Sequence, residues 1–399
     1  MPIHEISGVR SRSVILLIGL LGLIAAGCFL TLSVHRGIGT FQLTHFHFNY
    51  SDEFLRRGFV GEVLRQIGFP LSSLNVALLY SAAVVLFLLL LVIACAWTFA
   101  RLPARTGALF VVFMLACPGL TLHYAYSAYG YLDIFQLLLA AAGLMIIYRS
   151  TLPVALATAV LLSAMSILIH EIGLFFTAPI FIAALLLRFH ARLGVQSMLA
   201  LFGALLLLTI FVWRLGGTST MSFDDHVAAL TASAAHPDYI HPAAVLVLHR
   251  SLAENVGLII PKSFLWYLLQ QIKFFLLALP YLFFAVVSLQ AAKAYLSNAG
   301  QKPGAAALIL AVIAPVLLYP IGHDYFRWWS AAAANYFLLI FFLCAIHLDF
   351  RDRLQTLMDR HKRIMIIGIL IGLTVGGIGG MVSFSIHTAP PAMFYRMIF

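Results

Sequence analysis

The sequence predicts an all-helical protein that crosses a membrane several times. Of its 399 residues, 63% are hydrophobic, and the mean hydropathy is +1.02. A soluble globular chain is only about half apolar. Apolar runs of about 17 or more residues recur from one end of the sequence to the other, which is the length that a helix needs to cross a bilayer. Alternating segments typical of a transmembrane β-barrel are absent.

Hydropathy divides the chain into about eleven candidate spans, each close to the length of a transmembrane helix. They cover residues 14–34, 74–99, 107–122, 132–148, 152–169, 172–188, 195–213, 264–289, 305–320, 328–347 and 364–384. The first span follows Arg10 and Arg12 but lacks a small-residue cleavage site, so we expect it to be retained rather than removed as a signal peptide.

Charge alternates between the connecting segments and predicts the orientation. Short basic ends recur at every second connection, and the positive-inside rule places these in the cytoplasm. Ten of the fourteen acids fall on the opposite face: Asp52, Glu53, Glu62, Asp133, Glu171, Asp224, Asp225, Asp238, Glu254 and Asp324. We therefore expect one integral-membrane domain over residues 1–399, with a cytoplasmic N-terminus and an external C-terminus. Its external loops include residues 35–73 and a larger one at 215–262.

The first external loop contains the densest charge in a chain with only 10% charged residues. In the stretch Asn49–Leu64, Asp52 and Glu53 are followed by Arg56 and Arg57, and apolar residues recur at helical spacing. This pattern predicts an amphipathic helix on the membrane surface. In one interpretation Ser51 or Asp52 caps the helix and Glu53 pairs with one of the two arginines. In the other, Asp52 or Glu53 is a general base and the arginines hold a phosphate.

Two further polar groups fall at predicted span ends on the same face. Asp133 follows a tyrosine-rich segment and opens a span, as a helix cap or as a second acid in a polar pocket. His170 and Glu171 interrupt an apolar stretch of about 37 residues, which as one helix would be far longer than a bilayer is thick. We therefore expect two short spans that fold back at this pair, and ionisable residues at such a break are functional candidates.

The remaining candidates are cations and their neighbours near the last spans. His323, Asp324 and Arg327 lie in a tight turn on the external face, where Asp324 and Arg327 either pair with each other or bind substrate. Lys273 lies about ten residues into a span and either snorkels to the interface or meets a lipid phosphate. We interpret the histidines of the 215–262 loop as solvated, because they lack ligand spacing.

Metal and disulfide chemistry have no clear signature. The four cysteines all lie within apolar runs without CxxC spacing, which is typical of small buried side chains: Cys28, Cys95, Cys117 and Cys344. No metal or other cofactor is indicated with certainty; a divalent metal is compatible with the sequence, but no distinct ligand set marks one. The net charge of +10 follows membrane topology rather than a nucleic-acid surface.

The span number, the acidic pair in the first external loop and the large later external loop resemble the GT-C superfamily of integral-membrane glycosyltransferases. The turn at His323–Arg327 is also similar to segments of Wzy- or EpsG-type polysaccharide polymerases. The resemblance implies a sugar donor linked to a polyprenyl phosphate or diphosphate, such as undecaprenyl phosphate, and a glycan or lipid acceptor. It also implies transfer at the extracytoplasmic face of a bacterial inner membrane, with Asp52 or Glu53 as the base. Substrate binding would then fall to Arg56, Arg57, Asp133, His170, Glu171, Lys273, His323, Asp324 and Arg327.

Two other classes of function remain open from the sequence. A transporter or flippase for an anionic lipid or solute would place paired charges near mid-membrane and often has repeat symmetry. A non-catalytic subunit of an envelope complex would use the same charges only for structure.

Overall fold

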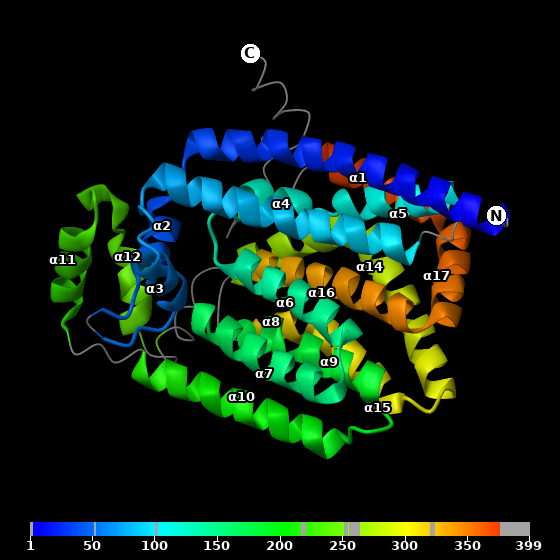
Figure 1. Cartoon of the computed structure of the whole chain (residues 1–399). Coiled ribbons are helices and arrows are strands. Elements are labelled where there is room, and N and C mark those ends of the chain that lie inside the picture. The colour runs from blue at the N-terminus through cyan, green and yellow to red at the C-terminus, as the bar shows by residue number, and fades with distance from the viewer. Residues whose placement is uncertain are drawn as a thin grey trace, which may run out of the picture.

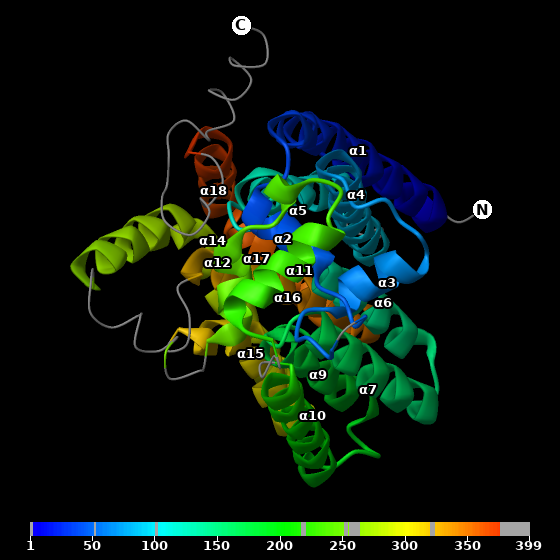
Figure 2. The same cartoon turned by 90° about the vertical axis from the view of Figure 1, so that its left-hand side faces the viewer.

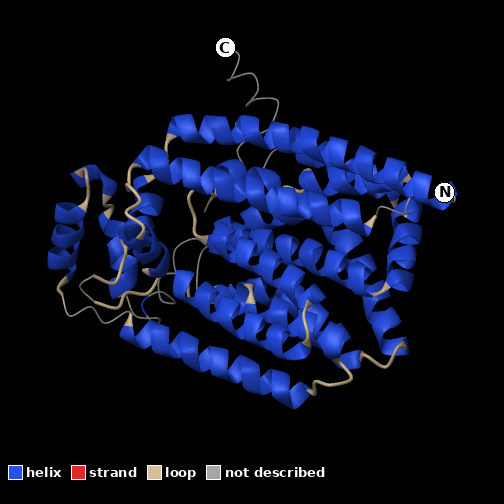
Figure 3. Cartoon of the chain, viewed as in Figure 1, coloured by secondary structure: helices blue, strands red, loops and turns tan. Residues whose placement is uncertain are grey.

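The computed structural model describes residues 3–51, 53–99, 103–216, 221–250, 254, 264–319 and 324–375, and all regular structure in this part of the chain is helical (Figure 3). Asp52 and His323 lie outside the described residues, as does the side chain of Lys273. The α-helices are α1 (Ile3–Arg36), α2 (Thr40–His47), α3 (Phe59–Gln66), α4 (Ser73–Thr98), α5 (Ala104–Leu115), α6 (Asp133–Arg149), α7 (Leu152–Ile169), α8 (Gly173–Phe176), α9 (Ala178–Phe189), α10 (Val195–Leu215), α11 (Phe223–Ser233), α12 (Pro242–His249), α14 (Phe264–Asn298), α15 (Lys302–Ile313), α16 (Tyr325–Ile346), α17 (Leu348–Arg360) and α18 (Lys362–Val375). The π-helical turn η1 (His123–Ser127) and the 3-10 turns η2 (Pro237–Tyr239) and η3 (Ala314–Leu318) complete the set.

Six segments of the described helices are long and apolar enough to cross a membrane, which indicates a multi-pass membrane protein. They are Arg12–Arg36, Ser73–Thr98, Leu152–Ile169, Val195–Leu215, Ala278–Asn298 and Tyr325–Ile346. Other predicted spans coincide with shorter apolar helices, such as α5 and α9, each of 12 residues. A helix of that length rises only about 18 Å, less than the roughly 30 Å of a hydrocarbon core. The count of about eleven spans therefore stays a prediction.

The predicted break at His170 and Glu171 is confirmed. Helix α7 ends at Ile169, His170 is extended (φ −161°, ψ 132°), and α9 packs back against α7. The amide of Gln136 on α6 donates to the carbonyls of Ser166 (2.9 Å) and His170 (3.0 Å). The polar break is thus held by a side chain of the neighbouring helix.

Short helices gather at one end of the bundle and a charged helix at the other (Figure 1). Helices α2, α3, α11 and α12 form one end, where they face the viewer in Figure 2. Helix α17 lies at the opposite end, which is also the end where α1 begins. The long helices run between these two ends, as expected for a bundle with two distinct membrane faces.

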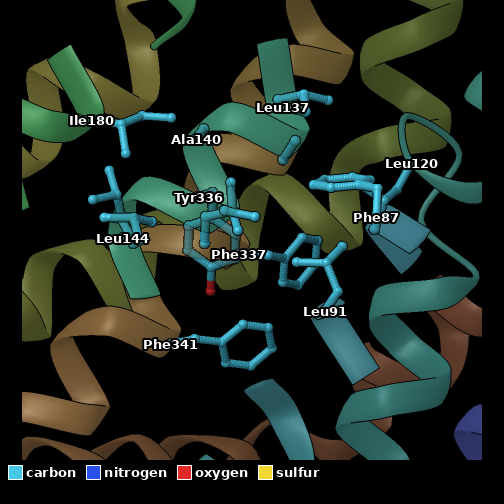
Figure 4. Close-up of a cluster of buried hydrophobic side chains, with 14 of the residues drawn as sticks. Phe87, Leu91, Leu120, Leu137, Ala140, Leu144, Ile180, Tyr336, Phe337 and Phe341 are labelled. Atoms are coloured by element: carbon cyan, nitrogen blue, oxygen red, sulfur yellow. The ribbon is translucent and has the colours of Figure 1, made fainter. Parts of the chain in front are cut away.

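Helix α16 is the centre of the bundle. It packs against α4, α6, α9 and α15, and nearly all of its side chains from Tyr325 to Cys344 are buried. Figure 4 shows Tyr336, Phe337 and Phe341 of this helix among apolar side chains that include Leu137 of α6 and Ile180 of α9. Burial of such side chains stabilises by about 25 cal/mol per Å² where it removes them from water.

One polar side chain in this core replaces a missing backbone donor. Pro315 has no N–H to give to the Ala311 carbonyl four residues earlier, and Asn335 of α16 donates to that carbonyl instead, at 3.0 Å. The same amide nitrogen donates to the Phe176 carbonyl at the end of α8, at 3.1 Å. Asn335 therefore fixes α16 to both interrupted neighbours.

The amphipathic helix of the first external loop is shorter than the sequence pattern predicted. The described residues from Asn49 to Gly58 are non-helical, and in this stretch only Phe59–Gln66 are helical as α3. The cause is Arg57, whose φ of +66° lies in the left-handed region that ends a right-handed helix.

The two bundle ends should be accessible from opposite sides of the membrane. We expect Asp238→Cys, near α11, to react with a membrane-impermeant maleimide in right-side-out vesicles, and Asp352→Cys on α17 to react only in inverted ones. Both carboxylates are exposed, whereas Cys95, Cys117 and Cys344 are buried and give a low background. Labelling of both variants from the same side would contradict this arrangement.

Candidate functional site

The first external loop is held against the bundle by close backbone packing. A side chain at Gly61 of α3 would collide with the carbonyls of Phe46 and Phe48 at the end of α2. A side chain at Gly216, which follows α10, would collide with the backbone of Arg56. The Arg56 amide donates to the Gly216 carbonyl at 3.1 Å. These contacts fix the loop from Tyr50 to Gly58 between α2, α3 and α10.

Arg57 forms a bidentate ion pair with Glu171 at the break after α7. Its Nη2 lies 2.6 Å from Oε1 and its Nε 3.1 Å from Oε2, and the side chains are only 12% and 6% exposed. The Nδ1 of His170 lies 3.1 Å from the same carboxylate. The carboxylate that pairs with Arg57 is therefore that of Glu171, 114 positions away in the sequence. From the sequence alone, the alternative partner was the nearby Glu53.

His45 of α2 completes this cluster as a neutral imidazole. Its Nδ1 lies 2.8 Å from the Phe41 carbonyl, which can only accept, so Nδ1 carries the proton. Its Nε2 then presents a lone pair to Nη1 of Arg57, 3.4 Å away. Burial and the charge of Arg57 lower the pKa of His45 from 6.5 to about 3, so the ring stays uncharged near neutral pH.

A second buried ion pair joins the starts of α6 and α16. Nη2 and Nε of Arg327 donate to the carboxylate of Asp133 at 2.6 and 2.8 Å, and Asp133 is fully buried. Arg327 also pairs with Asp324, three residues earlier, which is one of the two alternatives that the sequence left open. The guanidinium lies 4.1 Å from the ring centre of Tyr131, a cation–π distance.

The two ion pairs belong to one electrostatic cluster. His170 interacts with Arg57, Glu171 and Arg327, and Asp133 interacts with His170 and with buried His123 of η1. Arg57 therefore contacts Glu171 directly, and His170 links it electrostatically to Asp133 and Arg327. We call this set the buried charge network: His45, Arg57, Asp133, His170, Glu171, Asp324 and Arg327.

Arg56 points away from this network and closes the end of α12. Its Nη2 donates to the carbonyls of Val247, Leu248 (3.1 Å) and Arg250 (3.3 Å), and its guanidinium lies 4.2 Å from the ring centre of Trp213. These carbonyls are the ones that a helix C-terminus leaves unpaired. If Arg56 bound a phosphate, it would have to break its hydrogen bonds to the carbonyls at the C-terminal end of α12.

Glu53 lines a cavity of about 460 Å³ between the first external loop and α11. His47, Asn49 and Ser51 of the loop share this cavity with it, and His226 of α11 lies opposite. The Nδ1 of His226 is 3.0 Å from Nε2 of His249 on α12, and Glu53 interacts electrostatically with His249. The candidate base thus faces an open volume, whereas Glu171 and Asp133 are enclosed by their arginines.

Several histidines of this region were misjudged or missed from the sequence. The interpretation of the 215–262 histidines as solvated is wrong for His226, which is only 3% exposed. The helical spacing of Phe223, His226 and Leu230 was the signal that this histidine lies on the inner face of α11. His45 and His47 carry no sequence signal beyond their place in the loop.

The described residues hold no group of three or more His, Cys, Asp or Glu side chains arranged to bind a metal ion. The predicted catalytic role of Asp52 and the predicted substrate-binding roles of His323 and Lys273 fall outside the described atoms and stay predictions. The cysteines that the sequence indicated as unpaired are all free thiols.

No protein-family profile, curated protein or solved structure matches this chain. The features that bear on function are therefore the geometry of the buried charge network and of the cavity.

Removing one partner of the Arg57–Glu171 pair should cost far more than removing both. We expect Arg57→Met or Glu171→Met to destabilise the protein by about 3–5 kcal/mol, because each leaves a buried charge without compensation. The double variant should recover much of this loss. Thermal unfolding of the purified protein in detergent measures it.

The control is the exposed pair Glu62–Arg65 on α3, where Arg65→Met should change the unfolding temperature little, because solvent screens that pair. Additive losses in the Arg57/Glu171 double variant would contradict the proposed coupling.

The buried His45 should make stability fall in mild acid. Unfolded His45 takes up a proton near pH 6.5 and the folded residue only near pH 3, so its contribution is complete above pH 6.5 and is lost progressively below it. In His45→Gln the loss of stability between pH 7 and 5 should be shallower, by about 1.4 kcal/mol per pH unit at most. Thermal unfolding across this pH range measures the slopes, with exposed His236→Gln as the matched control; equal slopes in His45→Gln and wild type would contradict the assignment.

Proposed function

We propose that this protein is a membrane glycosyltransferase. It would move a sugar from a polyprenyl phosphate or diphosphate donor to a glycan or lipid acceptor at the extracytoplasmic face of a bacterial inner membrane. The observation that carries the proposal is the carboxylate of Glu53 on the wall of an open cavity, at the bundle end formed by α2, α3, α11 and α12 (Figure 2). A general base needs this kind of access to an acceptor hydroxyl.

The chemistry requires one carboxylate and a positive environment. Asp52 or Glu53 takes the proton of the acceptor hydroxyl while that oxygen bonds to the anomeric carbon of the donor sugar. The bond from this carbon to the phosphate oxygen breaks, and its electron pair leaves with the phosphate. The leaving group is already an anion, so it needs positive charge more than it needs a proton.

Arg57 and Arg327 are the cations best suited to this second task. Both are held rigidly by their carboxylate partners within the same cluster. Charges fixed in a low-dielectric site stabilise developing charge without reorganisation. Each guanidinium would act on the donor phosphate by sharing its N–H groups between that phosphate and its carboxylate partner, with His323 and Lys273 as further predicted contacts.

Transport is the second candidate, and the buried charge network is the observation that favours it. Paired charges beside a helix break and a π-helical turn are common along ion and substrate pathways. The network includes the helix break at His170–Glu171, and its Asp133 interacts with His123 of the π-helical turn η1. A purely structural role in an envelope complex would use the same contacts without turnover.

Isosteric changes in the acidic pair test the transferase proposal. In nanodiscs supplied with radiolabelled polyprenyl-linked sugars, we expect Asp52→Asn or Glu53→Gln to lower the transfer rate by about 100-fold or more, which is typical for loss of a general base. Asp238→Asn, an exposed acid of the same face, is the control and should retain the wild-type rate.

Full activity in both acidic-pair variants would overturn the assignment of the base. If no polyprenyl-linked donor is consumed by the wild-type protein and liposomes show solute flux instead, the transport alternative replaces the proposal.

A further inference from the structure

A residue that lines the cavity beside Glu53 carries a buried polar atom that has no partner among the described residues. His47 is 5% exposed, lines the cavity, and its Nε2 makes no hydrogen bond with the described residues. A buried nitrogen in this condition costs free energy unless another molecule supplies the missing bond. The same loop could have placed an apolar side chain here without that cost, so the atom points to a ligand.

The other residues that line the cavity indicate the chemical class of the ligand. Glu53 provides carboxylate oxygens, and Phe69, Leu71 and Leu230 provide apolar surface. Its volume of about 460 Å³ lies within the range of small-molecule sites, about 300–1,000 Å³. An aromatic ring beside a few polar groups suits a pyranose, which has apolar C–H faces and a rim of hydroxyls.

The charge of the site favours a neutral ligand over an anion. Burial lowers the pKa of His47, so its ring is uncharged and offers one donor and one acceptor, as a hydroxyl does. The cation on the cavity wall, Arg65, is bound by Glu62 at 2.7 Å. A phosphate would find the carboxylate of Glu53 facing it, whereas a hydroxyl can donate to that carboxylate.

We propose that this cavity is a carbohydrate subsite, in which His47 Nε2 and the carboxylate of Glu53 hydrogen-bond to hydroxyls of a neutral pyranose and Phe69 packs against its C–H face. Its role as the acceptor subsite rests on the proposed glycosyl transfer. Binding itself does not, because it needs neither a donor nor turnover. In this proposal His47 determines which sugar binds, because its Nε2 must meet a hydroxyl at a fixed position on the ring.

Direct binding of free sugars to the full-length protein in nanodiscs tests the subsite. The probes are the methyl α- and β-glycosides of glucose, galactose, mannose and N-acetylglucosamine, followed by saturation-transfer difference NMR at millimolar concentration. We expect at least one glycoside to bind and His47→Phe to weaken it about tenfold or more, which is the loss of one good hydrogen bond. Ala229→Trp, which fills the cavity from α11, should abolish the signal.

His236→Phe is the matched control, because this histidine is exposed just before η2 and is not among the residues that line the cavity. If His47→Phe fails to fold, Ala229→Trp decides. The subsite is overturned if no glycoside binds the wild type, or if both cavity variants bind as the wild type does. Sugar transfer without such binding would remove the subsite and keep the proposed function, whereas binding without any transfer would keep the subsite and remove its acceptor role.

Discussion

The buried pairing of Arg57 with Glu171 is the constraint on which the rest of the site depends. Each charge alone would be costly to bury, and the bidentate geometry compensates both at once. Glu171 lies where α7 breaks, so the pair joins the first external loop to the helix break in the bundle. The second pair, Arg327 with Asp133, joins the starts of α6 and α16 in the same way.

Adjacent arginines in the loop perform opposite tasks because of one backbone dihedral. The left-handed conformation of Arg57 turns the chain, so that its side chain enters the bundle while Arg56 reaches the end of α12. The loop is thereby anchored on both sides. The cavity between it and α11 has walls that these two anchors hold in place, which is the preorganisation that a binding site needs.

Local sequence patterns were sufficient to predict some of these features, but they carry no information about others. The length of the apolar stretch before and after His170 required a break, and the break is there, because a bilayer limits helix length. The pairing of Asp324 with Arg327 followed from their separation of three residues. The partners Asp133 and Arg327 are 194 positions apart, and nothing in the spacing of either indicates the other. The helix through Asn49–Leu64 was overextended because apolar periodicity carries no information about a left-handed residue within it.

The acids of the buried charge network and the acid that lines the cavity differ in how well they can accept a proton. A carboxylate that shares two hydrogen bonds with an arginine is a weak base, because the pairing stabilises its charged form. Glu171 and Asp133 are in this condition. Glu53 lies on the open cavity and is not held by either buried arginine pair. The enclosed acids therefore hold the structure together, and under the proposed function proton transfer would fall to the acidic pair of the first external loop, where Glu53 lines the cavity.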